Sequence, residues 1–146
     1  MARIASSFYR HVALTPHKQA VWCEGEEITY ADLAIKVRAW GRVLRHEGVR
    51  AGDHIGVVLD NSIEFVALML VAAELGLVLV PVSTASPQHM IERLFAATNV
   101  QHVVGLGRLI ADLELPEGAV RAVVGDPEKG MLDLRQTSGG VEAESP

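Results

Sequence analysis

Residues 137–140 read Thr-Ser-Gly-Gly, a combination that can bind phosphate through backbone N–H groups and hydroxyls. A working phosphate loop of this kind continues with small residues and a lysine. Here residues 141–144 read Val-Glu-Ala-Glu, and their two carboxylates would repel a triphosphate. We therefore interpret this stretch as something other than a functional phosphate loop.

A second glycine pair, Gly105 and Gly107, follows a predicted strand and could begin a GxGxxG dinucleotide fingerprint. Ile110 occupies the place of the third glycine, and no suitable acidic residue follows at the required distance. A plain strand-to-helix turn is the interpretation that we adopt. A small nucleotide-binding protein of the flavodoxin or Rossmann kind is an alternative, but no complete phosphate loop in this sequence supports it.

The remaining reactive side chains show no catalytic or metal-binding pattern. Cys23 is the single cysteine, which excludes an internal disulfide and any CxxC spacing. A nucleophilic Cys–His pair would need an oxyanion hole, which a predicted hairpin strand does not offer. No GxSxG elbow occurs, and no HExxH spacing occurs among the six histidines, which are His11, His17, His46, His54, His89 and His102. We predict no catalytic, cofactor-binding or metal-binding residue in this chain.

The elements are organised around residues 48–82, which predict a β-α-β unit. The helix is expected to begin with Asn61 as N-cap and Glu64 as its capping-box partner. Gly76 suits the left-handed position that ends a helix. The two strands are expected at residues 55–59 and 77–82.

The same region contains an apolar stretch, residues 65–82, close to the roughly 20 residues that span a bilayer. Glu74, Gly76 and Pro81 interrupt it, and the β-α-β unit explains these residues without lipid. We favour the soluble interpretation over a transmembrane segment.

The flanking elements complete an α/β pattern. Before the unit we expect a helix in residues 1–16, a hairpin of residues 19–23 and 27–29, and a helix capped by Thr29 that ends at Gly48. After it we expect a helix that follows Ser86 and Pro87, with Met90, Ile91, Leu94 and Phe95 facing inward, a strand at 101–104, a short helix at 108–113 and a strand at 120–124. The predicted fold class is α/β, a mostly parallel sheet with helices on both faces, preceded by an N-terminal helix and a short β-hairpin.

Composition limits the class of protein. The 146 residues fit one domain, and 49% hydrophobic with 21% charged residues is ordinary for a globular protein. A net charge of −5 argues against nucleic acid as a partner. The N-terminus has no apolar segment of signal-peptide length, so we expect a cytoplasmic protein.

Residues 126–146 are rich in Asp, Glu, Gly and Ser, and we expect a linker or disordered tail there, after a domain at 1–125.

Several short motifs occur in the order of one family. They are Thr15-Pro16 with Ala20-Val21, the ITYADL of residues 28–33, Gly48-Val49, Gly52-Asp53, the NSIE of residues 61–64, and residues 76–81. In this order they resemble the N-terminal subdomain of the adenylate-forming (AMP-binding) enzymes, which include acyl-CoA synthetases, luciferase and peptide-synthetase adenylation domains. The resemblance implies a flavodoxin-like half of the adenylate-forming fold. Each matching residue also has a structural explanation as a cap, a turn or a strand end.

The resemblance implies a ligase that converts a carboxylate and ATP to an acyl-adenylate, then forms a thioester with CoA or a carrier protein. We lean to an acyl-CoA synthetase of fatty acid metabolism. The family's TSGTTGxPKG loop, its adenine segment, its ribose-binding Asp and its catalytic Lys are absent here. ATP, Mg and CoA are thus implied for a complete parent enzyme only, and this chain alone is predicted to be inactive. The alternative is a stand-alone, non-catalytic interaction protein that pairs with a separate ligase partner.

Two surfaces follow from this interpretation. Loss of the remaining ligase subdomains should expose apolar surface, so a homodimer is a second possible partner arrangement. Arg38, Arg42 and Arg45 form a basic stripe on one helix, which we interpret as a solvated face, with docking of a carrier protein or partner domain as the alternative.

Overall fold

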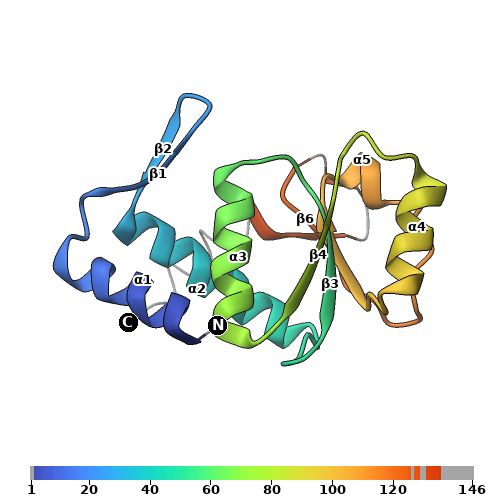
Figure 1. The fold of residues 1–146 in the computed structure, drawn as a ribbon, viewed down its shortest axis with the longest axis horizontal. Coiled ribbons are helices and arrows are strands. Elements are labelled where there is room, and N and C mark those ends of the chain that lie inside the picture. Colours follow the sequence, from blue (N-terminus) through green and yellow to red (C-terminus); the bar gives the residue numbers. More distant parts are fainter. Residues whose placement is uncertain (1, 126, 129–130, 136–146) are drawn as a thin grey trace.

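A five-stranded parallel sheet forms the centre of the computed structural model, which describes residues 2–125, 127–128 and 131–135. The strand order is β4-β3-β5-β6-β7, and each neighbouring pair is parallel (Figure 1). The strands are β3 (His54–Val58), β4 (Val78–Val82), β5 (His102–Gly105), β6 (Arg121–Val123) and β7 (Leu132–Asp133). The first strand of this sheet in the sequence, β3, is therefore an interior strand, with β4 on one side and β5 on the other.

Helices cover both faces of the sheet, as the sequence predicts. In Figure 1, α2 (Tyr30–His46) and α3 (Ile63–Leu75) lie on one side, with α4 (Gln88–Ala97) and α5 (Gly107–Ile110) on the other. Side chains of β3 alternate between the two faces of the sheet. Ile55 and Val57 pack in the core beneath α2 and α3, while Val58 packs in the core beneath α4 and α5. The predicted α/β class is confirmed.

The N-terminal elements lie against the outer helices rather than in the main sheet. Helix α1 (Ala2–Leu14) contacts α2 and α3, and β1 (Gln19–Cys23) pairs antiparallel with β2 (Glu26–Thr29). The hairpin turns at Glu24 and Gly25, whose φ angles of 50° and 85° match the positive-φ turn that suits the twist of paired strands. The predicted N-terminal helix and hairpin are thus confirmed.

The start of α3 differs from the prediction by one residue. Ser62, not Asn61, is the N-cap, and its Oγ accepts a hydrogen bond from Phe65 N at 3.2 Å. The capping-box pair of Asn61 and Glu64 is wrong because the strand ends at Val58 and the loop needs one more residue before the first helical turn. At the other end, Gly76 has φ 75°, which confirms the predicted left-handed cap.

The cap assignment gives a direct stability prediction. Replacing Ser62 with alanine should lower the free energy of unfolding by about 1 kcal/mol, because the N–H of Phe65 loses its acceptor. Asn61→Ala is the matched control and should change it by less than about 0.5 kcal/mol. Urea unfolding of both variants measures the difference. A larger loss for Asn61→Ala than for Ser62→Ala would restore the original assignment.

Helix α4 also departs from the prediction. Pro87 precedes it and no side chain caps it, so Ser86 is not the N-cap. Ile91 and Phe95 are buried, whereas Met90 and Leu94 are 54% and 40% exposed. A ten-residue helix on a flat sheet buries a single stripe spaced four residues apart, so the neighbouring apolar residues face outward.

Part of the expected tail belongs to the sheet. Strand β7 (Leu132–Asp133) lies inside residues 126–146, pairs with β6, and is followed by Leu134, which is fully buried in the core. Residues 136–146 fall outside the described part of the chain.

The apolar stretch 65–82 divides between α3 and β4. Within the described ranges, no helix combines the length and apolar composition needed to cross a membrane.

Candidate functional site

The strand order marks one edge of the sheet as the place where a ligand would bind. From β3 the chain adds β4 on one side, and β5 then pairs on the other side of β3. Helices leave the carboxyl ends of β3 and β5 in opposite directions, which opens a crevice at this switch point. In open α/β sheets, ligands bind outside the carboxyl ends of the strands at such a point. We therefore take the loops after β3, β4 and β5 as the candidate site.

The loop after β3 is held by one hydrogen bond to the loop after β4 and by another within itself. Thr84 Oγ1 donates to Asp60 Oδ1 at 2.6 Å, and Ser62 Oγ donates to the Asp60 carbonyl at 3.1 Å. Asp60 and Asn61 are exposed. The arrangement fixes one carboxylate at the mouth of the crevice, with one of its oxygens already bound by a hydroxyl. The sequence analysis did not single out Asp60 or Thr84; an acidic residue directly after a buried strand was the available signal.

The loop after β5 contains the glycine pair of the possible dinucleotide fingerprint. A Cβ at Gly105 would lie 2.7 Å from the Val58 carbonyl oxygen, so this glycine permits close approach of the two strand ends. Gly107 N donates to the Gly125 carbonyl at 2.9 Å and begins the four-residue helix α5. The pair thus forms the strand-to-helix turn that the sequence predicts.

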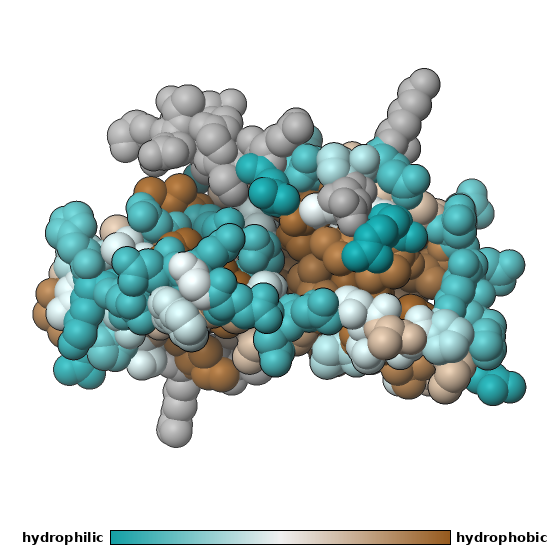
Figure 2. Space-filling model, turned by 90° about the horizontal axis from the view of Figure 1, so that it is seen from above, coloured by the Kyte–Doolittle hydropathy of each residue, from teal (hydrophilic) through white to brown (hydrophobic). Residues whose placement is uncertain are grey.

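The surface at this edge is mainly apolar. Figure 2 looks down on the carboxyl ends of the strands and shows apolar side chains gathered over the middle of the molecule, with polar residues around them. At the strand ends the apolar residues are Leu59, Val82, Leu106 and Val124, all buried or half-buried. Such a surface suits contact with an apolar group or with another part of a larger protein.

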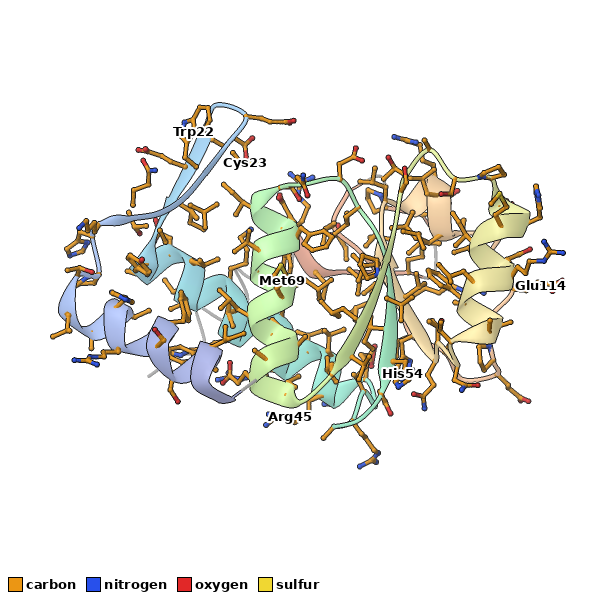
Figure 3. The ribbon with its side chains drawn as sticks, viewed as in Figure 1. Trp22, Cys23, Arg45, His54, Met69 and Glu114 are labelled. Atoms are coloured by element: carbon orange, nitrogen blue, oxygen red, sulfur yellow. The ribbon has the colours of Figure 1, made fainter. Side chains whose placement is uncertain are left out.

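The reactive residues considered in the sequence do not converge on this edge. Cys23 lies on the hairpin, where its Sγ donates to the Asn61 carbonyl at 3.6 Å (Figure 3). His54 and His102 lie at the opposite, amino end of the strands, where His102 Nε2 is 3.1 Å from Asp53 Oδ2. His102 Nδ1 accepts from Val120 N at 2.9 Å, so Nε2 carries the proton that Asp53 accepts. The sequence analysis did not predict the pairing of Asp53 with His102.

Tyr9 carries the most perturbed ionisation that the structure shows. Its hydroxyl donates to Glu74 Oε2 at 2.9 Å, and Arg38 lies over its ring at 4.9 Å. Burial of the phenol raises the pKa of Tyr9 to about 12, and the hydrogen bond and negative charge of Glu74 add to this, while Arg38 opposes them. This contact ties α1 to α3 far from the candidate site.

The raised pKa predicts a loss of stability in strong base. Below pH 10 Tyr9 is protonated in both states, and between 10 and about 12 the unfolded chain loses its proton first, so unfolding is favoured progressively. Tyr9→Phe should remove this component of the pH dependence. Urea unfolding at several pH values compares the two proteins, with Tyr30→Phe as control. Identical pH profiles for wild type and Tyr9→Phe would contradict the prediction.

A family profile described as AMP-binding enzyme matches residues 8–143, which is most of the chain. The chain belongs to the AMP-binding enzymes. The match confirms the family that the short motifs suggested. Curated relatives and solved structures agree with it.

The curated relatives are much longer proteins. Tyrocidine synthase 2 of Brevibacillus parabrevis is 26% identical over 129 residues, covering 86% of this chain and 4% of the synthase. Gramicidin S synthase 2 of Brevibacillus brevis is 32% identical over 91 residues, covering 62% and 2%. A 3-oxocholest-4-en-26-oate–CoA ligase of Rhodococcus rhodochrous is 27% identical over 92 residues, covering 63% and 17%. The chain therefore spans a small fraction of each relative.

Solved AMP-binding structures share the fold. The nonribosomal peptide synthetase FmoA3, with α-methyl-L-serine-AMP bound, has a TM-score of 0.74 and 29% identity, covering 90% of this chain and 15% of FmoA3. The N-terminal subdomain of Klebsiella oxytoca NpsA, in complex with anthranilyl-AMSN, has a TM-score of 0.70 and 24% identity, covering 93% and 32%. At that identity the NpsA match supports the fold alone. This AMP-binding chain has the fold of the N-terminal piece of such an adenylation domain.

The described residues do not by themselves fit ATP with Mg²⁺. No group of three or more His, Cys, Asp or Glu side chains within these residues is placed to hold a metal ion. The loops after β3 and β4 present one exposed carboxylate, Asp60, and no lysine or arginine. The nearest arginines, Arg108 after β5 and Arg135 after β7, belong to separate segments, so these loops alone are a poor match for a triphosphate. Residues 137–144, where the sequence resembles the start of the family's phosphate loop, lie outside the described part. We derive no step of ATP chemistry from this AMP-binding chain alone.

Proposed function

We propose that this chain is the N-terminal portion of an ATP-dependent acyl-activating ligase. In the proposed reaction a substrate carboxylate attacks the α-phosphorus of ATP, an acyl-adenylate forms, and pyrophosphate leaves. The observation that carries the proposal is the AMP-binding family match over residues 8–143. Similarity to FmoA3, which was solved with an aminoacyl-adenylate-like ligand, supports the same reaction type.

We propose a carrier-protein thiol as the acceptor of the acyl group. The match to tyrocidine synthase 2 covers 86% of this chain, against 63% for the CoA ligase, and FmoA3 is also a peptide synthetase. These relatives do not support the leaning toward coenzyme A and fatty acid metabolism that the sequence motifs gave. Coenzyme A is the alternative acceptor, since a CoA ligase is among the relatives.

The described residues would form a wall of the active-site cleft in the parent ligase. The apolar carboxyl edge, with Leu106 and Val82, faces the side where strand-end loops bind ligands. The resemblance implies that the phosphate loop, the adenine and ribose contacts and the catalytic lysine belong to the other subdomains. Those subdomains are the proposed partner, the chain alone is predicted to lack adenylation activity, and a cytoplasmic location remains a prediction.

An exchange assay tests this function. ATP–pyrophosphate exchange is measured with a panel of amino, aryl and fatty acids for the 146-residue chain and for the protein made from its native gene. We expect no exchange from the chain and acid-dependent exchange from the native protein. Calorimetric titration of the chain with ATP·Mg²⁺ should likewise show no binding. Exchange by the chain alone would overturn the assignment of the catalytic groups to the remaining subdomains.

Intact-mass analysis of the native protein separates this proposal from the alternative of a stand-alone interaction protein. A mass well above 15.7 kDa together with exchange supports a ligase. A mass that matches this chain, without exchange, supports a non-catalytic protein that pairs with a separate ligase partner.

A further inference from the structure

A groove of about 520 Å³ lies where α2 passes α3, on the side of the molecule away from the carboxyl edge. Its floor is apolar and is made by Val37, Gly41 and Leu75. Gly41 has no side chain at the crossing, and a Cβ there would sit 3.9 Å from Leu75 Cδ1, an ordinary contact. Gly41 is buried, so the missing side chain lets α2 and α3 pack closely, and the half-buried Leu75 is the apolar residue of the floor that a partner can reach.

Arginines line one wall of this groove. Arg38, Arg42 and Arg45 project from successive turns of α2, and all three are exposed. A neighbouring cavity of about 310 Å³ shares Arg45 and adds Arg50 from the turn before β3. Figure 3 shows Arg45 near the C-terminal end of α3, and this residue lines both cavities. Four of the chain's 13 Lys and Arg residues thus surround one surface feature.

The positive charge of this groove is largely uncompensated. Among residues 2–125, 127–128 and 131–135, no carboxylate lies within ion-pair distance of the Arg42, Arg45 or Arg50 guanidinium. Glu74, on the opposite wall, already accepts a hydrogen bond from Tyr9. A protein of net charge −5 therefore concentrates positive charge here, which creates a local field that attracts acidic groups.

The spacing of the arginines distinguishes between kinds of anion. Arg38 and Arg45 are seven residues apart on α2, which corresponds to about 10 Å along the helix axis. A single phosphate could contact the neighbouring Arg42 and Arg45 but would leave the rest of this row unengaged. The arginines match carboxylates that repeat along a polypeptide, and the apolar floor matches an apolar side chain between them.

We propose that this groove is a docking site for an acidic, amphipathic segment of a partner protein. Glutamates or aspartates of the segment pair with Arg42, Arg45 and Arg50, and one apolar side chain packs on Leu75 at the floor of the groove. The sequence alone favours a solvated face for the arginine stripe; the groove and its apolar floor favour binding. The proposal is independent of the adenylation activity, because the groove is remote from the candidate edge.

Fluorescence anisotropy with a labelled peptide tests the proposal on the full chain. The probe is a Glu/Leu amphipathic peptide of about 15 residues, long enough to form helix, and its counterpart has every Glu replaced by Gln. We expect the Glu peptide to bind, the Gln peptide to bind at least about tenfold more weakly, and the Glu-peptide affinity to fall with added salt.

Charge-reversal variants localise the binding. Arg42→Glu with Arg45→Glu should weaken binding of the Glu peptide by about tenfold or more. Arg93→Glu, an exposed arginine of α4, is the matched control and should leave it unchanged. Circular dichroism and thermal unfolding establish that the double variant is folded, and Arg42→Gln with Arg45→Gln repeats the test without reversal.

Two outcomes would overturn the proposal. Equal affinity of the double variant and Arg93→Glu would place the peptide elsewhere. In a competition assay, tripolyphosphate and the unlabelled Glu peptide each displace the labelled Glu peptide. If tripolyphosphate does so at lower concentrations than the unlabelled peptide, the groove is a phosphate site and not a protein-docking site.

Discussion

Valine in place of Gly56 should destabilise the chain by about 3 kcal/mol, or more if the strand cannot shift. Gly56 lies in the middle of β3, and a Cβ built there would be 2.4 Å from Cζ of Phe95, with two further ring atoms within 2.9 Å. Phe95 is 2% exposed and packed in the core beneath α4, so its ring has no free space to move into. Urea unfolding of Gly56→Val and of the milder Gly56→Ala measures the loss.

Two comparisons show whether the clash is the cause. Gly56→Ala should lower the free energy of unfolding less in a Phe95→Leu background than in the wild type, with a coupling of about 1 kcal/mol, because leucine leaves room for the added Cβ. Gly41→Ala is the matched glycine control, since its Cβ meets only ordinary contacts and alanine favours a helix by about 1 kcal/mol. A Gly56→Ala variant as stable as wild type would refute the close packing of Phe95 on β3.

Trp40→Ala should be the most destabilising truncation in α2, at about 3 to 5 kcal/mol. Trp40 is fully buried in the larger core, with Leu33, Val37 and Leu44 buried on the same helix. Removing the indole leaves a cavity that the rigid sheet and helices cannot fill. Since domains of this size are stabilised by about 5 to 15 kcal/mol in total, this variant should be largely unfolded at moderate temperature.

Trp40→Phe should be much milder, within about 1.5 kcal/mol of wild type. Among the described residues the Trp40 Nε1 atom has no hydrogen-bond partner, so phenylalanine removes an unpaired buried donor while it keeps most of the packing. Urea unfolding followed by circular dichroism compares Trp40→Phe and Trp40→Ala with wild type, because it does not depend on the tryptophan that these variants remove. A Trp40→Phe variant as unstable as Trp40→Ala would contradict this and show that phenylalanine cannot replace the packing of the indole.

The sequence predicted the parts of the fold that depend on local chemistry. Thr29 caps α2 by accepting from Asp32 N, and Gly76 ends α3 in a left-handed conformation, because each requirement is set by neighbouring residues. The Asn61 error has the same origin: two adjacent residues, Asn61 and Ser62, can both cap a helix, and the length of the preceding loop decides between them.

Features that depend on distant contacts could not be predicted. Met90 and Leu94 are apolar at helical spacing, yet whether they are covered depends on how α4 lies on the sheet. Strand β7 has two residues, too few for a periodic pattern, and it forms because β6 offers an unpaired edge.

The candidate edge needed the strand order as well as the strands. The sequence predicts strands that correspond to β3, β4 and β5, but a sequence pattern does not say on which side of β3 the chain places β5. That choice brings the loop of Asp60 beside the loop of Gly105 and creates the switch point. Side chains such as Asp60 and Thr84 gain their position from the topology, so residue types alone could not identify them.

The position of β3 has a consequence for the synthesis of the chain. The first strand of the sheet to be made, β3, ends up inside it: β4 joins one of its edges, and β5, β6 and β7 then extend the sheet from the other edge in turn. As the polypeptide leaves the ribosome from its N-terminus, each new strand meets an edge that already exists, and none must insert between two formed neighbours. Helices α1 and α2, which pack against the apolar helix α3, are also synthesised before it. The fold can therefore be assembled in the order of translation.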